Sequence, residues 1–318
     1  MLFQRRSWLA DPIHIPALVI VVSISSIFLL VPSSVALSSS SSSASISSTS
    51  MPSLGARVLA DIVTSAARHD ESVSLDVNGI MWLEHINLVV GSKDDAELFY
   101  HDFLGCSKDQ SSSFHRNLGQ QQFHLAENGD PAQVITGSVG LTVPSLDSIR
   151  ERLPAASEAL GASTKFEILE DSKDCMTMIC PWGNRLHLYD IRNDNLESTS
   201  DSTQKMVKLH AEGGSYGPQR MAVRGQPGIR YIEIACPKGT SQAIANFYKE
   251  IFRCTVSKPT QETTVVCAGP GVHLVFAENK DLTQKDMAAM KGVHICIYAN
   301  DFEMLYRRLA SRKCKYIP

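Results

Sequence analysis

Short segments of alternating hydrophobic and polar residues run along the chain, and their order repeats. Trp82–Val90 alternates like a strand, and an amphipathic helix that contains Phe99 follows it. Gly228–Cys236 repeats the strand pattern, and a second amphipathic helix contains Phe247. Each of these phenylalanines lies seven residues before a cysteine, Cys106 or Cys254. The pattern therefore predicts an internal duplication.

Both copies continue with further strands and one more helix. The first copy is predicted to contain strands at Gly119–Glu127, Gly137–Val143, Thr164–Leu169, Asp174–Cys180 and Asn184–Tyr189, with a helix at Ser145–Leu153. The second is predicted to contain strands at Thr263–Ala268, Gly271–Glu278 and Gly292–Tyr298, with a helix at Asp301–Leu309. The chain ends at Pro318, where the second copy should continue with its last strands. We therefore expect an α+β protein of repeated βαβββ units whose second copy is incomplete, either a fragment or an incomplete gene model.

The N-terminal part has a different composition. Arg5 and Arg6 precede an apolar run, Ala17–Val31, which is short for a membrane span and suits the core of a signal peptide. A serine tract extends to Ser50, and there are no acidic residues from Pro12 to Ala60. This order suits a bipartite leader that routes a protein to a plastid; the alternatives are the secretory pathway, a membrane anchor at the apolar run, or a flexible serine linker. The spacing of apolar residues over Leu54–Arg68 predicts a short helix.

We divide the chain accordingly. The predicted parts are a signal peptide (1–36), a serine-rich transit or linker segment with a short helix (37–78), a first domain (79–192), a linker (193–227) and an incomplete second domain (228–318). Once the leader is removed, we expect no stable association with a membrane.

Composition excludes several classes of function. Hydrophobic residues make up 43% of the chain and charged residues 20%, and the net charge is −3. This balance argues against a nucleic-acid partner, which needs a clustered basic excess. The 8 cysteines include no C-x-x-C pair and are spread through apolar segments, so they favour a reducing compartment over a disulfide framework.

Two motifs carry a resemblance to a known family. The order "His-Ile-Asn-Leu-Val-Val" from His85, then "Phe-Tyr-x-x-Phe-Leu-Gly" from Phe99, resembles the vicinal oxygen chelate superfamily, which includes glyoxalase I, extradiol dioxygenases and bleomycin-resistance proteins. The segment Cys180–Leu188 resembles the closing strand of its unit. The resemblance implies two tandem domains, each with paired βαβββ units that curl a sheet into a cup, and a small-molecule site inside the cup. It also implies a homodimer, because members of this fold often pair units across subunits.

Strand alternation predicts which side chains face each cup. Since the apolar residues of each strand must face the helices, the polar residues between them face the other way. The residues expected on the cup faces include His85, Gln122, His124, Ser138, Arg185, His187 and Tyr189 in the first domain and Tyr231, Glu233, His273 and His294 in the second.

The resemblance assigns roles to some of these residues. Its metal-ligand positions correspond to His85, His124, His187, His273 and His294, together with Ser138 and Tyr231, which are not histidines. Histidine suits divalent Fe, Zn, Ni, Mn or Cu. Within the first domain, His85, His124 and His187 are the expected ligands, and Gln122, Arg185 and Tyr189 would orient the substrate. In the second domain, Tyr231 and Glu233 are the expected substrate contacts.

Two functions remain open at this stage, beside a third interpretation in which the protein is a diverged duplicate whose cup histidines only satisfy polar neighbours. The first is a metal-dependent enzyme, a lyase or dioxygenase, acting on a small molecule with vicinal oxygens. The second is a metal-free small-molecule binding protein of the bleomycin-resistance type. The ligand positions match no named activity of the family in full, and the sequence assigns no catalytic residue.

Overall fold

A computed structural model of the chain describes residues 53–73, 79–110, 112–190, 227–269, 271–283, 286–287 and 290–312, with the backbone alone for 67–73. It also describes the backbone of two short strands, β1 (Leu2–Phe3) and β2 (Leu18–Ser23). Apart from these strands, the predicted signal peptide and the serine tract lie outside the described residues, as does the linker up to residue 226. In the part of the chain that the structure describes, no helix has the length and apolar character needed to cross a membrane.

The described chain from Ile80 consists of successive βα units, as the sequence predicts. Unit 1 comprises β3 (Ile80–Val89), α3 (Lys93–Ala96) continuing as a π-helical turn, η1 (Glu97–Phe103), then β4 (Ser107–Lys108), β5 (His115–Leu118) and β6 (Gln121–Ala126). Unit 2 comprises β7 (Ser138–Val143), α4 (Leu146–Leu160), β8 (Glu167–Asp171), β9 (Cys175–Ile179) and β10 (Arg185–Asp190).

Units 3 and 4 follow after the linker. Unit 3 comprises β11 (Gly228–Pro237), α6 (Ser241–Phe247) with its π-helical turn η4 (Tyr248–Phe252), β12 (Val256–Thr260), β13 (Thr263–Cys267) and β14 (His273–Asn279). Unit 4 is described as β15 (His294–Ala299) and α8 (Phe302–Ser311). The strand–helix–three-strand order of units 1 to 3 is the βαβββ architecture that the sequence predicts.

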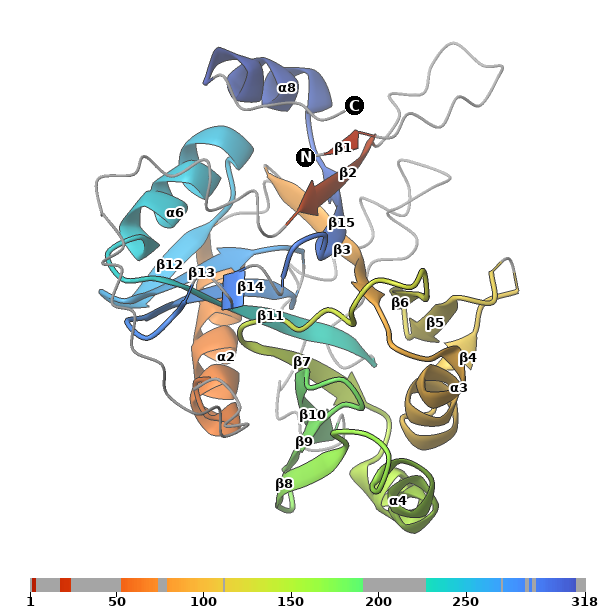
Figure 1. Ribbon diagram of the computed structural model, residues 1–318. Helices are drawn as coiled ribbons and strands as arrows, with labels where there is room; N and C mark the ends of the chain where they lie inside the picture. Colours follow the sequence, from red (N-terminus) through yellow and green to blue (C-terminus); the bar gives the residue numbers. More distant parts are fainter. Residues whose placement is uncertain are drawn as a thin grey trace.

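The pairing of the units does not follow the two domains that the sequence predicts. One sheet has the strand order β1-β2-β15-β3-β6-β5-β4, and the other has β12-β13-β14-β11-β7-β10-β9-β8. Antiparallel pairing of β3 with β15 joins units 1 and 4, and antiparallel pairing of β11 with β7 joins units 2 and 3. Each sheet therefore combines strands from both sides of the linker, and the units of one predicted domain do not share a sheet (Figure 1).

One face of each sheet is covered by helices and forms the core. Tyr100 of η1 lies against Phe123 of β6 with ring centroids 4.9 Å apart, and Tyr248 of η4 lies against Phe276 of β14 at 5.6 Å. These aromatic side chains are almost fully buried, so the alternation of apolar residues along β6 and β14 sets which face carries the helices.

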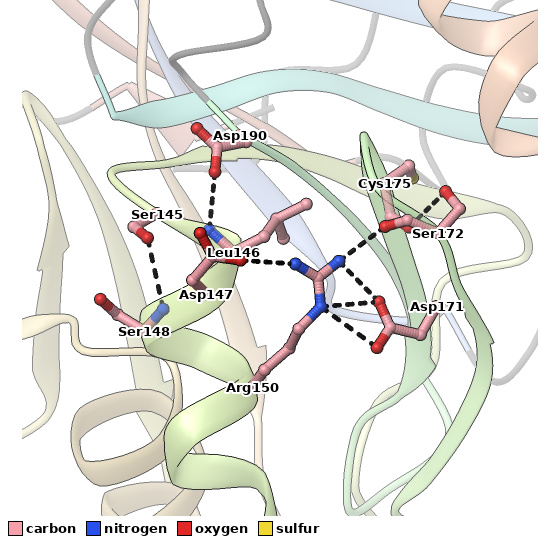
Figure 2. Close-up of polar contacts among 9 residues, drawn as sticks. All are labelled: Ser145, Leu146, Asp147, Ser148, Arg150, Asp171, Ser172, Cys175 and Asp190. Carbon is pink, nitrogen blue, oxygen red and sulfur yellow. Dashed lines mark hydrogen bonds and ion pairs between the residues drawn. The ribbon is translucent and has the colours of Figure 1, made fainter.

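Helix α4 is fixed to the strands of its own unit by polar contacts (Figure 2). The buried carboxylate of Asp190, at the end of β10, accepts a hydrogen bond of 2.9 Å from the backbone N–H of Leu146 in the first turn of the helix. Arg150 donates to Asp171 at 2.8 Å, to Asp147 at 2.9 Å and to the carbonyl oxygen of Ser172 at 2.6 Å. The helix continues through Pro154 to Leu160, beyond the predicted end at Leu153.

The predicted N-terminal helix is present as α2 (Ala56–Val73). It lies on the side of the second sheet opposite to α6, and Figure 1 shows β12, β13 and β14 between the two helices. Its buried residues Leu59 and Val63 belong to a small apolar cluster with Val265 and Val275 of that sheet.

Candidate functional site

Each sheet carries polar side chains on the face opposite to the helices of its own βα units. The first, here called the histidine face, consists of Glu84, His85, His115, Gln122, His124, His294 and Cys296 on β3, β5, β6 and β15. The second, here called the tyrosine face, consists of Ser138, Thr177, Arg185, His187, Tyr189, Tyr231, Glu233 and His273 on β7, β9, β10, β11 and β14. The strand pairing brings the residues of each face together.

A bulge in β3 brings Glu84 beside His85. Cys296 of β15 lies opposite His85 and Ile297 lies opposite Leu83, so Glu84 is the extra residue between them. A bulge of this kind interrupts the strict alternation of side chains. The carboxylate of Glu84 consequently forms a short contact with Nδ1 of His85. A corresponding bulge occurs in β11, where Arg230 is the extra residue between Ile229 and Tyr231.

Three imidazoles are stacked on the histidine face. The ring centroids of His85 and His124 are 3.5 Å apart, as are those of His124 and His115. Nε2 of His124 lies 3.0 Å from Oε1 of Gln122. Because the Gln122 amide nitrogen donates to Asp109 and Asn117, its oxygen is the acceptor, so Nε2 of His124 carries the proton and Nδ1 is left as an acceptor.

Burial favours the neutral form of three imidazoles on this face, those of His115, His124 and His294, by lowering their pKa values. Burial lowers the pKa of His124 to about 3, and the neighbouring His85 and His115 lower it further than Glu84 raises it. Burial also lowers the pKa of His115 and of His294. Neutral imidazoles have a lone pair available for a metal ion or for a hydrogen bond from a ligand.

The acidic and thiol groups of this face influence each other. Burial raises the pKa of the Glu84 carboxyl, but the hydrogen bond and charge of His85 outweigh this, so that the pKa lies below its ordinary value. Burial and the neighbouring Glu84 raise the pKa of the Cys296 thiol well above its ordinary value. An anionic carboxylate beside a protonated thiol would favour the binding of a metal cation. Coordination of the thiol sulfur to that cation would release the thiol proton.

Three donor atoms of the histidine face lie close enough to hold one metal ion. The ligand atoms of Glu84, His85 and Cys296 all lie within 4.8 Å of one another. Carboxylate oxygen, imidazole nitrogen and thiolate sulfur together form a donor set that zinc and other divalent transition metals accept. The residues present therefore fit such an ion.

The tyrosine face is closed by direct contacts between its side chains. The ring of Tyr231 lies over Gly140 of β7, where a β-carbon would be only 2.2 Å from a ring carbon. Its hydroxyl lies 2.8 Å from that of Tyr189. Only a residue without a side chain leaves room for the ring at this place, so Gly140 and Tyr231 depend on each other.

Glu233 is the buried carboxyl of the tyrosine face. It accepts hydrogen bonds from the hydroxyl of Ser138 at 2.7 Å, the hydroxyl of Ser53 at 2.6 Å and the backbone N–H of Leu54 at 2.9 Å. Burial raises the pKa of Glu233, and these bonds and the charge of Arg185 offset part of the increase.

His187 is buried in the same face. Its Nδ1 lies 3.0 Å from the hydroxyl of Thr177, whereas its Nε2 is buried and finds no hydrogen-bond partner in the described part of the chain. Burial, with a smaller contribution from Arg185, lowers the pKa of His187 to about 4. A buried polar atom of this kind calls for an explanation.

The structure regroups the predicted site residues. His85, His124 and His294 lie together on the histidine face, with Gln122 beside them. His187, predicted as the third ligand with His85 and His124, lies instead on the tyrosine face, as does His273. The physical reason is that unit 1 pairs with unit 4 rather than with unit 2. The predicted substrate residues Arg185, Tyr189, Tyr231 and Glu233 likewise lie on the tyrosine face, away from Gln122.

Three residues of the histidine face were not among the predicted site residues. Glu84 was missed because the bulge cannot be read from alternation, and His115 because β5 was not predicted. Cys296 was treated as a buried hydrophobic residue, although it alternates with Ile295 and Ile297 in β15. That alternation is the signal that could have placed its thiol on the polar face.

Comparisons with known proteins find similarity in three dimensions only. No protein-family model matches the chain, and no curated protein matches its sequence. Glyoxalase I from Zea mays is 12% identical over 73% of this chain and 79% of that protein, with a TM-score of 0.42. A glyoxalase/bleomycin resistance protein from Albidiferax ferrireducens T118 is 18% identical over 34% of this chain and 96% of its own length, with a TM-score of 0.26. A glyoxalase/bleomycin resistance protein/dioxygenase from Nocardioides is 15% identical over 40% of this chain and 92% of its own length, with a TM-score of 0.26.

Proposed function

We propose that the histidine face binds one divalent transition-metal ion through Glu84, His85 and Cys296, and that the protein acts there on a small molecule with adjacent oxygen atoms. The observation that carries the metal site is the proximity of three different donor atoms, within 4.8 Å of one another. The class of substrate follows from the sequence resemblance to the vicinal oxygen chelate superfamily. Bound in this way, the ion would act as a Lewis acid toward substrate oxygens.

The protein's own residues would bind and orient the substrate. Nδ1 of His124 is directed by the hydrogen bond that Nε2 makes to Gln122, so it is the atom that would accept a hydrogen bond from a substrate hydroxyl. Gln122 is held by Asp109 and Asn117 and would keep this imidazole in one tautomer. His294 lies on β15, which pairs with β3 on the side away from β6; it is half-buried at the same face and would contact the substrate from that side.

Metal content of the purified full-length chain tests the proposal. We expect about one zinc or cobalt ion per chain after reconstitution, and with cobalt an absorption band of thiolate-to-metal charge transfer. Both should be lost in His85→Ala and in Cys296→Ser. The matched control is Cys267→Ser, which removes a half-buried thiol from β13 of the other sheet and should retain the ion. A chain that binds no metal after reconstitution would overturn the proposal.

A metal-free binding protein is the alternative function. The stacked imidazoles and Gln122 then provide hydrogen-bond donors and acceptors for a small polar ligand. In that case Cys296→Ser would leave ligand affinity unchanged, whereas His124→Ala would weaken it.

We also propose that the N-terminal residues are a leader that directs the protein to a plastid, with the secretory pathway or a membrane anchor as the alternatives. The support is the arginine pair, the apolar run Ala17–Val31 and the acid-poor serine tract after it. A fluorescent protein fused to residues 1–78 would report the destination, and N-terminal sequencing of the mature protein would report the cleavage site. Cleavage near Ala36 is expected.

We infer in addition that the two halves arose by duplication and that the protein forms a homodimer. The helices of units 1 and 3 both end in a π-helical turn, and β3 and β11 both carry a bulge at the corresponding position. For the dimer, the support is the sequence resemblance to a fold that often pairs units across subunits. Light scattering of the full-length protein gives its mass in solution, and a monomer would contradict this part.

A further inference from the structure

The N-terminal helix α2 covers the tyrosine face. Its buried residues are Ala56, Leu59, Val63 and Ala66, and the sheet contributes Cys175, Tyr189, Tyr231, Val265 and Val275 to the same cluster. The opposite side of the helix is exposed, as at Val58, whose side chain is 49% exposed. The helix therefore lies on the sheet as an added layer, separate from the main core cluster, to which none of its described side chains, those of residues 56–66, belongs.

The start of α2 occupies hydrogen-bonding groups of the tyrosine face. Glu233 binds the hydroxyl of Ser53 and the N–H of Leu54, and the hydroxyl of Tyr189 donates to the carbonyl oxygen of Ala56 at 2.7 Å. These contacts are of the kind that a bound molecule would make: two donors directed at a carboxylate and one acceptor at a phenol. The chain supplies them from residues 53–56, which precede every strand of the sheet that they cover.

The covering is incomplete in one respect. His187 is only 2% exposed, yet its Nε2 has no hydrogen-bond partner among the residues that the structure describes. The apolar side of α2 offers no polar group to this atom among the residues of the cluster. A permanent core would rarely leave such an atom unsatisfied, whereas a site for a polar ligand commonly contains one.

We propose that α2 is a detachable lid over a second binding site, and that the tyrosine face beneath it takes a small molecule that donates hydrogen bonds to Glu233 and contacts His187. While α2 is in place, Ser53 and Leu54 donate to Glu233 the hydrogen bonds that the ligand would otherwise donate. When α2 leaves, both sheets remain folded, because the main core does not include it. This site is distinct from the metal site and does not depend on it.

Release of the lid can be measured on the full-length chain with its own cysteines. Cys175 lies under α2, whereas Cys180, just after the same strand, belongs to the main core. Both are buried. In Leu59→Asp, a thiol reagent should modify Cys175 at least about tenfold faster than in the unchanged protein, with Cys180 unchanged, since only the local layer opens. Mass spectrometry of the peptides distinguishes the two sites.

Matched variants separate a lid from a structural helix. Val58→Asp places the same charge on the exposed side of α2 and should change neither rate. The milder Leu59→Ala/Val63→Ala double variant should raise the rate at Cys175 alone, which guards against a misfolded aspartate variant. If Cys175 and Cys180 become reactive together in both Leu59→Asp and Leu59→Ala/Val63→Ala, α2 is an integral part of the fold and the proposal of a lid is wrong. If neither cysteine reacts faster in these variants, α2 does not cover the tyrosine face and the proposal is likewise wrong.

The ligand part is tested with a dipeptide that has the same donors as the lid. N-acetyl-seryl-leucinamide carries the hydroxyl and N–H that Ser53 and Leu54 present to Glu233. At saturation it should slow the carbethoxylation of His187 by diethyl pyrocarbonate in Leu59→Asp at least about threefold, since a bound ligand covers the ring. The same dipeptide should have no effect in Leu59→Asp/Glu233→Gln. Absence of protection in Leu59→Asp would overturn the second site.

Discussion

The ring of Tyr231 lies over the α-carbon of Gly140, so closely that a β-carbon there would be 2.2 Å from Cε1 of the ring. Gly140→Ala must therefore displace a fully buried tyrosine or the strand beneath it. We expect the free energy of unfolding to fall by about 1–3 kcal/mol, the usual cost of overpacking. Urea denaturation of the full-length chain measures this change.

Two comparisons make the test specific. Gly55→Ala is the matched control, because no atom lies within 4 Å of a β-carbon at that position. In a Tyr231→Ala background the clash is absent, so Gly140→Ala should cost much less than in the unchanged protein. Equal costs in both backgrounds would show that the ring is not responsible.

His187 should make stability depend on pH. Its pKa is lowered from 6.5 to about 4 in the folded protein, so the unfolded chain binds the proton more readily between these values. The free energy of unfolding is therefore unaffected by His187 above pH 6.5. As the pH falls toward 4, protonation of His187 in the unfolded chain lowers the free energy of unfolding by up to about 3 kcal/mol. Between pH 6.5 and pH 4, the free energy of unfolding of the unchanged protein should fall relative to that of His187→Gln by about 3 kcal/mol. A difference that is constant with pH would contradict the prediction.

The contacts of α4 in Figure 2 should be unequal in energy. Asp190 is 2% exposed and binds the helix at its first turn, so Asp190→Ala leaves a buried N–H without this acceptor and should cost about 1–3 kcal/mol. Arg150 and Asp171 are partly exposed to solvent, and Arg150→Ala should cost at most about 1 kcal/mol. Thermal unfolding of both variants checks this order, and the reverse order would contradict it.

Metal binding should stabilise the protein measurably. An ion that binds only the folded chain adds about 2.7 kcal/mol when its free concentration is 100 times the dissociation constant. We expect zinc to raise the melting temperature of the unchanged protein and of Cys267→Ser, and a chelator to reverse the rise. Cys296→Ser and Glu84→Gln should respond weakly or not at all. Magnesium should have little effect, because it prefers a full set of oxygen ligands.

Alternation along single strands was sufficient to predict the polar face of strands without a bulge. In β6 the buried Phe123 and Leu125 alternate with Gln122 and His124, as the sequence indicates. Such a pattern is local, since successive side chains of a strand point to opposite faces whatever strand lies beside it. The strand and helix that begin units 1 to 3 could be predicted from such local patterns, whereas the short strand β5 was not predicted.

The neighbours of each strand could not be predicted in this way. Placing His294 rather than His187 near His85 depends on the pairing of β15 with β3, which joins segments about two hundred residues apart. The bulge at Glu84 depends on the same pairing, because it is defined only by the residues opposite to it. The sequence by itself therefore determined the repeated units, the helix that became α2 and the polar face of the strands, except at the bulged Glu84. Only the tertiary structure decided which units share a sheet, which histidines meet Glu84 and Cys296, and that α2 covers the tyrosine face, because these depend on contacts between distant segments that no local pattern encodes.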